Sequence, residues 1–375
     1  MSTPRHPDAR PARISVALTA PARRALFGLA AATAATAAAV AAVAVSIVPA
    51  RAADRELNLY SARHYQTDEA LYQDFTRTTG IRINRIEAGD EALLERLRSE
   101  GAKSPADVLL LVDAARLWRA QIDGLFQPVK SRTLETRIPA HLRGKDDGRG
   151  SEWFAISTRA RVIVYNRQTV APDTVRNYED LANPALKGKV CTRSGAHPYM
   201  LSLIGAMSEH LGEAGAQQWA SGVVANFARP PRGGDTDQIK AVASGECGVA
   251  LTNTYYLVRM MRSDSPDDKA AVAKIGVVWP NQASWGTHVN ISGGGVLKNA
   301  PHREAAIAFM EYLASDSAQI YLANGNNEWP VVKTAVARNP ALEALGPFKA
   351  DDLPIASIGR AQITAAKIID RVGWR

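Results

Sequence analysis

The stretch RELNLYSARHYQTDEALYQDFTRTTGIRINRIEAGDEALLERLRSEGAKSPADVLLLVD, residues 55–113, decides the fold class. Alternating Leu57 and Leu59 predict a strand, and the segment DEALYQDFTRTTG predicts an amphipathic helix that ends at its glycine. A second strand (IRINRIEAG) and a second helix (DEALLERLRSEG) follow, and the continuous apolar run ADVLLLVD is typical of a strand buried on both faces. The order β-α-β-α-β predicts a parallel sheet covered by helices.

A second α/β pattern begins after residue 154. Its predicted strands are RVIVYN, GKVCTR, CGVALTN, IGVVWP and GGGVLK, with helices around 199–211, 235–244 and 302–315. The chain therefore predicts an α/β fold of two lobes, each a mixed, mostly parallel sheet flanked by helices. Two lobes joined by more than one crossing suit an exported ligand-binding protein that closes like a clamp. We place lobe one at 55–154 plus 281–330, and lobe two at 155–280 plus 331–375.

The first 52 residues have the three regions of a secretory signal peptide. Arginines precede an Ala/Val-rich stretch at 25–48, and a motif Ala-Arg-Ala ends at Ala52. The apolar stretch is long enough for an uncleaved anchor, but alanine is weakly hydrophobic, so we expect cleavage near Ala52 and release into the periplasm. The pair Arg23-Arg24 loosely resembles a twin-arginine signal, which leaves the general and the twin-arginine routes both open.

The charge and the cysteines narrow the class of protein. The whole chain has a net charge of +8, and its first 52 residues hold six arginines against one aspartate. The remaining chain is thus only about +3, which gives no support for nucleic-acid binding. Cys191 and Cys247 both follow the signal peptide, so a single disulfide is reasonable in an oxidising compartment, with two buried thiols as the alternative.

Polar and aromatic residues stand directly after three of the predicted strands, where ligands bind in α/β sheets. His64 and Tyr65 follow the first strand, Tyr199 follows GKVCTR, and the pair Tyr255-Tyr256 follows GVALTN. Adjacent tyrosines would point to opposite faces of a continuing strand, but at a helix start they lie about 100° apart and can converge. Each tyrosine taken alone is more often a packing residue, whereas the joint arrangement favours a binding site.

Phenol oxygens indicate which metal such a site would take. Free tyrosine has a pKa of about 10, so only a hard, highly charged cation such as Fe³⁺ displaces its proton. Oxygen donors with one imidazole suit ferric iron better than zinc, which favours cysteine and histidine. The sequence contains no C-x-x-C, H-E-x-x-H or EF-hand pattern.

Four segments, NLYSARHYQTD, STRARVIVYN, SGAHPYMLSL and GVALTNTYY, together resemble the periplasmic ferric-iron-binding proteins of ABC transporters, in the branch that uses several tyrosines. The resemblance implies a two-lobed type II periplasmic binding protein with Fe³⁺ in the cleft between the lobes. It implies as metal ligands His64, Tyr65, Tyr199, Tyr255 and Tyr256. Four phenolates exceed the ferric charge by one, and Arg259, one helical turn after Tyr256, is our candidate for a nearby compensating cation. No separate carbonate or phosphate is then expected.

The same resemblance implies a function in iron transport. The protein would capture Fe³⁺ and deliver it, as a monomer, to an inner-membrane ABC permease and its ATPase, without enzymatic chemistry. One alternative is a binding protein for a small organic or anionic ligand on the same fold. Against it, such a site needs charge opposite to its ligand, whereas oxygen donors dominate here. Another alternative is an iron-dependent enzyme, but five protein ligands leave little room for a substrate.

Four further features are weaker candidates. His197 lies two residues before Tyr199, but the intervening proline allows it to face water. Glu91 is a carboxylate that can join the ligands, although an acid at a helix start is also favoured by the helix dipole. His288 is interpreted as structural and near a crossing between the lobes. Gly293–Gly295 lack the Lys-Ser/Thr pair of a phosphate loop, so we interpret them as a tight turn.

Overall fold

The computed structural model describes residues 55–63 and 65–375. The expected signal peptide and His64 lie outside the described residues. The amino-terminal part has the predicted β-α-β-α-β order, and Gly80 ends the first helix with a left-handed φ of 71°. Its elements are β1 (Glu56–Ser61), α1 (Asp68–Thr79), β2 (Arg82–Glu87), α2 (Asp90–Glu100), β3 (Val108–Leu111), α3 (Ala114–Ile122) and α4 (Arg132–Arg137).

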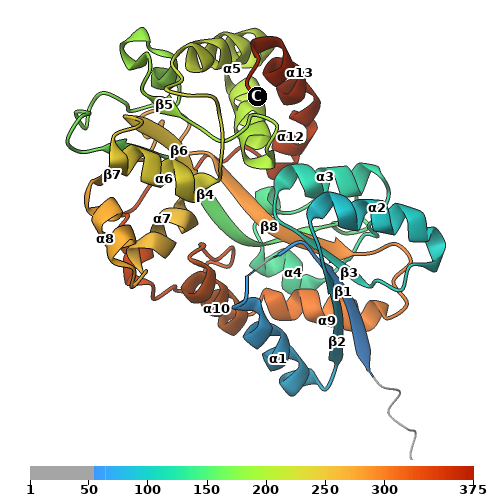
Figure 1. The fold of residues 1–375 in the computed structure, drawn as a ribbon. Coiled ribbons are helices and arrows are strands. Elements are labelled where there is room, and N and C mark those ends of the chain that lie inside the picture. Colours follow the sequence, from blue (N-terminus) through green and yellow to red (C-terminus); the bar gives the residue numbers. More distant parts are fainter. Residues whose placement is uncertain (1–54, 64) are drawn as a thin grey trace, which may run out of the picture. The chain divides into compact units, whose positions relative to one another are not determined.

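Two long strands lie in the middle of the sheet. β4 (Phe154–Asn166) pairs along its first part with β8 (Val289–Val296), and along its second part with β6 (Val249–Asn253) and β7 (Ile275–Val278). The strand order is β2-β1-β3-β8-β4-β6-β5, with β7 also on β4 (Figure 1). β4 therefore passes from one group of strands into the other.

β4 is longer than the predicted strand RVIVYN. Polar residues interrupt the apolar pattern of its first half, and the structure buries them. Ser157, for example, is 1% exposed and its hydroxyl donates a hydrogen bond of 2.7 Å to Glu328. A strand prediction based on alternating apolar residues does not detect buried polar residues whose hydrogen-bond partners lie in a distant loop.

The strand pairing is more evenly mixed than the expected mostly parallel sheet. β1 is parallel to β2 and β3, and β5 (Val190–Cys191) is parallel to β6. Every described pair that involves β4 or β8 is antiparallel. The expectation was too strong because β4 runs through both groups and β8 joins it to β3, and the direction of these two strands depends on long-range pairing that the local pattern does not encode.

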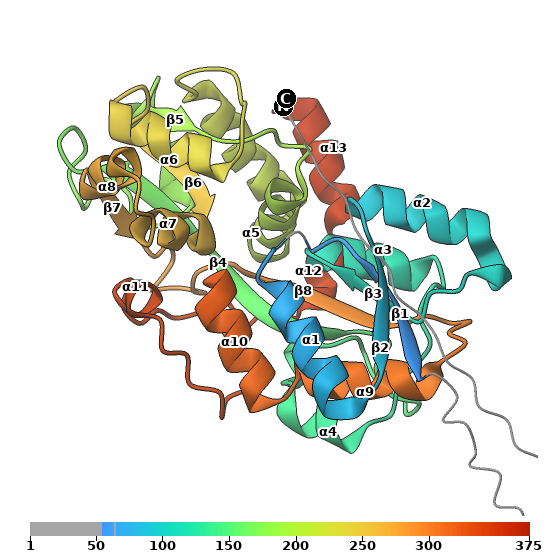
Figure 2. The same cartoon turned by 60° about the horizontal axis from the view of Figure 1, so that its bottom comes forward.

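The remaining helices cover the sheet, as the two views in Figures 1 and 2 show. α5 extends beyond the predicted 199–211, because the chain resumes helix after a break at Gly212 (φ 72°) and buries Trp219 and Val223. Within the described residues, no helix combines the length and apolarity needed to span a bilayer. These helices are α5 (Pro198–Ala225), α6 (Asp235–Ser244), α7 (Thr254–Met261), α8 (Pro266–Ala273), α9 (Arg303–Leu313), α10 (Asp316–Asn326), α11 (Pro340–Glu343), α12 (Ile355–Arg360) and α13 (Gln362–Val372).

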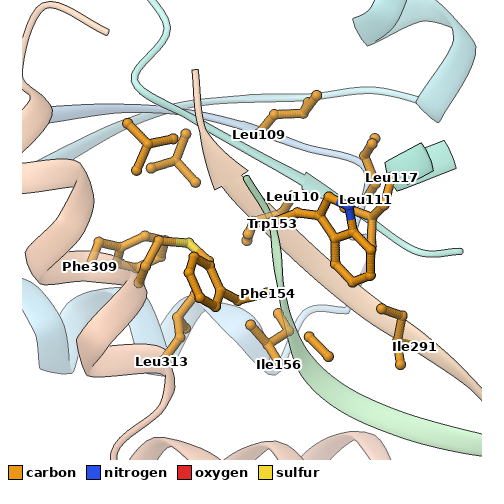
Figure 3. Packing of buried hydrophobic residues seen from close by; sticks show 14 of the residues in the cluster. Leu109, Leu110, Leu111, Leu117, Trp153, Phe154, Ile156, Ile291, Phe309 and Leu313 are labelled. Atoms are coloured by element: carbon orange, nitrogen blue, oxygen red, sulfur yellow. The ribbon is translucent and has the colours of Figure 1, made fainter. Parts of the chain in front are cut away.

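The apolar residues form separate clusters in the two groups of strands. The largest contains Phe154 of β4, with Phe309 and Leu313 of α9 on the same side of the strand (Figure 3). Two others lie on the part of the sheet formed by β4, β6 and β7, one around Trp219 and one around Cys191. Separate cores suit a two-lobed molecule, while the residue boundaries of the lobes stay a prediction.

Candidate metal centre

Four tyrosines from three parts of the fold lie together. The hydroxyl oxygens of Tyr199 and Tyr255 are 2.9 Å apart and share a hydrogen bond. The rings of Tyr255 and Tyr256 are 4.2 Å apart, and the ring of Tyr65 lies edge-on to that of Tyr255 at 6.2 Å. The structure thus brings together four of the five predicted ligands, and the fifth, His64, is outside the described residues.

The double tyrosine is placed by a strand-to-helix junction. β6 ends at Asn253, the N-cap of α7, so Tyr255 and Tyr256 fall in the first helical turn as the sequence predicts. Tyr255 is 1% exposed, whereas Tyr256 is half-buried. Thr254 fixes the junction to the neighbouring strand, because its hydroxyl accepts the Ala160 N–H at 3.3 Å.

Tyr199 is placed by the start of α5. His197 is the N-cap of that helix, and its Nδ1 accepts the Tyr199 N–H at 3.2 Å. Burial lowers the pKa of His197 to about 3, with Arg193 as the next cause, so its imidazole is neutral at physiological pH. In this structure His197 supports the position of Tyr199 rather than joining the phenol oxygens.

Arginines surround the tyrosine rings. The guanidinium carbons of Arg193, Arg159 and Arg161 lie 5.0, 5.5 and 5.9 Å from the centre of the Tyr199 ring. Arg63 lies 4.8 Å from the Tyr65 ring. Such contacts are favourable with a neutral phenol and become stronger when a phenolate forms. The site therefore holds positive charge ready to balance an excess of phenolate.

The predicted compensating cation, Arg259, is also beside the pair. Its guanidinium carbon is 5.4 Å from the ring centre of Tyr256 and 5.9 Å from that of Tyr255, and the residue is exposed. Sequence reasoning missed the buried Arg159 and Arg161. Their signal is two arginines on one face of an otherwise apolar strand, in STRARVIVYN.

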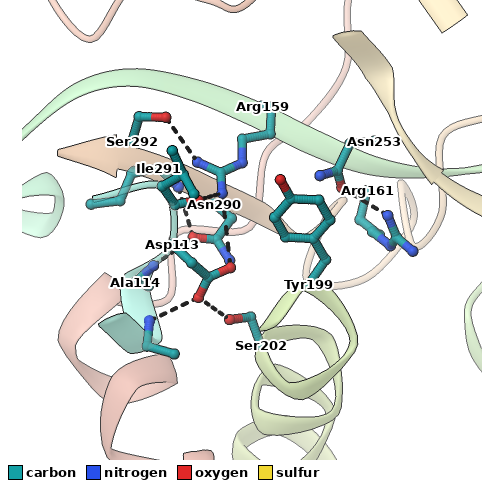
Figure 4. A network of polar contacts seen from close by, with 12 residues as sticks. Asp113, Ala114, Arg159, Arg161, Tyr199, Ser202, Asn253, Asn290, Ile291 and Ser292 are labelled. Carbon is teal, nitrogen blue, oxygen red and sulfur yellow. Dashed lines mark hydrogen bonds and ion pairs between the residues drawn. The ribbon is translucent and has the colours of Figure 1, made fainter. Parts of the chain in front are cut away.

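Arg159 connects the tyrosines to a polar network in the middle of the sheet (Figure 4). It lies 3.8 Å from Asp113, whose carboxylate accepts hydrogen bonds from Ser202 at 2.7 Å and Asn290 at 2.9 Å. Asp113 caps α3 in one part of the fold, and Ser202 belongs to α5 in the other. The network therefore couples the tyrosine cluster to residues of both groups of strands.

Burial keeps the phenols protonated in the absence of metal. It raises the pKa of Tyr65, Tyr199 and Tyr255 above the ordinary value, and mutual repulsion among the tyrosines raises the pKa of Tyr199 and Tyr255 further. A ligand that needs phenolates must therefore displace these protons itself. Hard trivalent cations do so, and soft or weakly charged ions do not.

A cavity of about 470 Å³ opens beside Tyr199 and Tyr256. Its wall also contains Arg193 and His197, and from the other part of the fold Arg63 and the start of α2 at Asp90. The cavity thus lies between elements of the two strand groups, where the sequence predicts the ligand. Among the described residues there is no cluster of three or more His, Cys, Asp or Glu that could bind a metal ion. The candidate donors in the wall of this cavity are the phenols of Tyr199 and Tyr256, together with Glu87, Asp90 and His197.

The acidic residue of α2 that lines the cavity is Asp90 and not Glu91, the candidate from the sequence. Glu91 is exposed and forms an ion pair with Arg116, and it is not among the residues that line the cavity. Its neighbour Asp90 lines the cavity and is half-buried, and burial raises its pKa. Sequence alone could not choose between adjacent acids at a helix start, because the choice depends on the rotation of the helix.

Two other sequence features have structural roles. His288 is 1% exposed, burial lowers the pKa of its imidazole to about 3, and its backbone N–H donates to the Tyr178 hydroxyl at 3.2 Å. Gly293–Gly295 lie within β8 and do not form the expected tight turn. A Cβ atom at Gly295 would come within 2.2 Å of the carbonyl oxygen of Glu152, which lies just before β4, so these glycines permit close packing of the backbone.

Cys191 and Cys247 form a disulfide with a Cα–Cα distance of 5.9 Å. Cys191 ends β5, which leads to Tyr199, and Cys247 precedes β6, which leads to Tyr255 and Tyr256. Both cysteines are 1% exposed, within the apolar cluster around Val242. The disulfide therefore links the two segments that lead to Tyr199 and to the pair Tyr255 and Tyr256.

Comparisons with known proteins agree with this geometry. Residues 103–350 match the family described as bacterial extracellular solute-binding protein. Iron uptake protein A1 of Synechocystis is 49% identical over 321 residues, which are 86% of this chain and 88% of that protein. Iron uptake protein A2 of the same organism is 48% identical over 335 residues, 88% of this chain and 94% of that protein.

Solved structures give the same result for the fold. The Trichodesmium protein FutA (IdiA), solved in complex with iron and citrate ligands, superimposes with a TM-score of 0.81 at 50% identity and covers 85% of this chain and 100% of its own. The ferric binding protein from Campylobacter jejuni has a TM-score of 0.80 at 40% identity, with 85% and 100% coverage. The resemblance and the type II binding-protein fold predicted from the sequence are thereby confirmed.

Proposed function

Because this chain belongs to the family of bacterial extracellular solute-binding proteins, we propose that it captures ferric iron and delivers it to an inner-membrane ABC permease. The observation that carries the proposal is the 2.9 Å contact between the Tyr199 and Tyr255 oxygens, with Tyr65 and Tyr256 beside them. Relatives over most of this chain carry names of iron uptake and ferric-iron-binding proteins. The donor chemistry and the relatives support the same ligand.

Iron binding would exchange phenol protons for the metal. As Fe³⁺ reaches the cluster, each coordinating phenol releases its proton to solvent and becomes an acceptor-only oxygen. Arg159, Arg193 and Arg259 then face the phenolates and lower the cost of gathering negative charge. His64, next to Tyr65 in the chain, is the proposed fifth ligand.

Capture would close two lobes over the metal. We keep the boundaries 55–154 plus 281–330 and 155–280 plus 331–375, with β4 as the strand that pairs with strands of both groups. The cavity between α2 and α5 supports such closure, because it separates tyrosines of one part from Arg63 and Asp90 of the other. Tyr199, Tyr255 and Tyr256 would bind from the second lobe, and Tyr65, whose ring lies 6.2 Å from that of Tyr255, from the first.

The cellular setting completes the proposal. The chain would be exported with cleavage near Ala52, remain monomeric in the periplasm, and dock on a permease that works with an ATPase. It would carry out no catalysis, since its bound metal is cargo. A second candidate, a small organic anion as the ligand, is favoured only by the size of the cavity and by Arg63 and Arg193 in its wall.

A visible absorption titration with ferric citrate tests the function. Mature wild-type protein should develop a tyrosinate-to-iron charge-transfer band that saturates at one equivalent. Tyr256→Phe should weaken the band, whereas Tyr312→Phe should not. The hydroxyl of Tyr312, the matched control, donates hydrogen bonds to the Leu71 carbonyl and the Asp74 carboxylate, away from the cluster. A wild-type protein that stays colourless while citrate binds would favour the organic anion and overturn the iron proposal.

A further inference from the structure

One buried carboxylate joins every segment that carries Tyr199, Tyr255 and Tyr256. Asp235, the first residue of α6, is 0% exposed. Its Oδ2 accepts hydrogen bonds from Arg161 at 2.5 Å and from the Asn253 N–H at 2.7 Å. Its Oδ1 accepts a hydrogen bond from Arg193 at 3.2 Å. These partners belong to β4, to the end of β6 and to the segment after β5.

Each partner of Asp235 contacts or precedes a candidate ligand. Arg193 and Arg161 lie over the ring of Tyr199, at 5.0 and 5.9 Å. Asn253 is the N-cap of α7, two residues before Tyr255, and its side-chain oxygen also accepts a hydrogen bond of 3.0 Å from Arg161 (Figure 4). Asp235 therefore reaches Tyr199 through Arg161 and Arg193, and it reaches the start of α7, which carries Tyr255 and Tyr256, through Asn253.

The net charge of Asp235, Arg161 and Arg193 affects the relative stability of ferric and ferrous iron at the site. Two guanidinium groups and one carboxylate leave a net charge of +1 beside the tyrosines. Without Asp235 the same group would carry +2 in a buried region, where screening by water is weak. Fe³⁺ and Fe²⁺ differ by one charge, so additional fixed positive charge destabilises the ferric form more than the ferrous form.

We propose that Asp235 is a positioning residue of the iron site, which orients Arg161, Arg193 and the start of α7 and, through its charge, strengthens the preference for ferric iron. The inference rests on the proposed function. It adds a role for a carboxylate that touches none of the candidate ligands. Its effect differs from that of a purely structural residue, which would weaken the binding of both oxidation states alike.

Spectroelectrochemical titration of the iron-loaded protein tests this role, with the tyrosinate–iron band as the signal. In Asp235→Asn the ratio of ferric to ferrous affinity should fall about tenfold, which equals a rise of about 59 mV in the midpoint potential of a one-electron couple. Asp107→Asn is the matched control. Asp107 is also 0% exposed, accepts the Asn58 N–H at 2.7 Å and precedes β3, which is parallel to β1, so it lies at the opposite end of these strands from Tyr65.

Two further variants separate charge from geometry. Arg193→Gln removes one positive charge and should shift the midpoint potential in the opposite direction. The double variant Asp235→Asn/Arg193→Gln restores the net charge and should return the potential toward the wild-type value. If Asp235→Asn fails to fold, the direction in which Arg193→Gln shifts the midpoint potential still tests whether fixed charge at this position sets the preference for ferric iron.

The outcomes also separate this inference from the proposed function. A wild-type protein without any iron-dependent band overturns both. If the wild type is coloured and the potential of Asp235→Asn matches that of Asp107→Asn, only the role of Asp235 is overturned. The same conclusion follows if the midpoint potential of the double variant differs from that of the wild type by more than the potential of Asp235→Asn does.

Discussion

The hydroxyl oxygens of Tyr199 and Tyr255 lie within hydrogen-bond distance, although 56 positions separate the two residues in the chain and they begin different helices. A hydrogen bond between two phenols requires that at least one keeps its proton. Burial and mutual repulsion raise the pKa of both, so both are neutral at pH 7. Iron that binds to these phenols, as we propose, must therefore exchange with their protons.

The number of protons released when iron binds should equal the number of coordinating tyrosines. At pH 7 each phenol that binds Fe³⁺ releases one proton, so Tyr199→Phe should release about one proton fewer per iron than the wild type. The measurement is a pH-stat titration with ferric nitrilotriacetate, corrected for the release by the chelate alone. Tyr312→Phe, as control, should match the wild type. An unchanged count in Tyr199→Phe would show that Tyr199 is not a ligand.

The same pKa shifts predict the alkaline stability of the unloaded protein. Tyr65, Tyr199 and Tyr255 hold their protons in the folded state above the pH at which the unfolded chain loses them, about 10. The unfolded state then binds fewer protons, so the free energy of unfolding should fall as the pH rises above about 10. Urea unfolding at pH 8 and pH 10.5 measures this loss.

A variant isolates the contribution of the site to that loss. Tyr255→Phe has no phenol to ionise, so its stability should fall less between the two pH values than that of the wild type. Iron-loaded wild type, whose phenols are already ionised, should also fall less. Equal losses in wild type and Tyr255→Phe would contradict the buried, protonated state of Tyr255.

The two acids at the start of α2 give a sharper test of the ligand set. Glu91 is exposed and paired with Arg116, so Glu91→Gln should leave the affinity for ferric iron within about twofold of the wild type. Tyr256→Phe, which removes a candidate ligand, should lower it by more than tenfold. Competition with citrate gives both values. A large loss in Glu91→Gln would place that carboxylate on the metal in the closed protein.

The sequence predicted the part of the fold that local periodicity encodes. The β-α-β-α-β order at 55–113 and the helix at Asp235–Ser244 are confirmed, because their apolar periods and end signals agree. The length of β4 and the direction of the central strands escaped prediction. Both depend on partners that are distant in the chain, such as Glu328 for Ser157 and Val249 for Tyr165.

The candidate site divides along the same line. The tyrosines stand directly after strands and at helix starts, positions that the local pattern locates, so their convergence was predictable. The arginines around them were not, because Arg159 and Arg161 lie inside β4 and Arg193 after a strand of two residues. Nor does the sequence show that Asp235 pairs with two of these arginines, since that contact exists only once β4, β5 and α6 have packed.

The disulfide gives a prediction about stability that is separate from iron. Cys191 and Cys247 are 56 residues apart, and a cross-link over such a loop restricts the unfolded chain. Cys191→Ala/Cys247→Ala should therefore lower the free energy of unfolding by about 2–4 kcal/mol, measured by urea denaturation of the unloaded protein.

The iron site itself should survive the loss of the bridge. β5 and β6 still pair in parallel at Val190 and Val249, and Asp235 still joins Arg193 to Asn253, so the segments carrying Tyr199 and Tyr255 keep two other connections. The double alanine variant should thus bind one equivalent of iron with an unshifted charge-transfer band. If the band is lost while the protein remains folded, the disulfide, rather than the carboxylate network, holds the tyrosines in register.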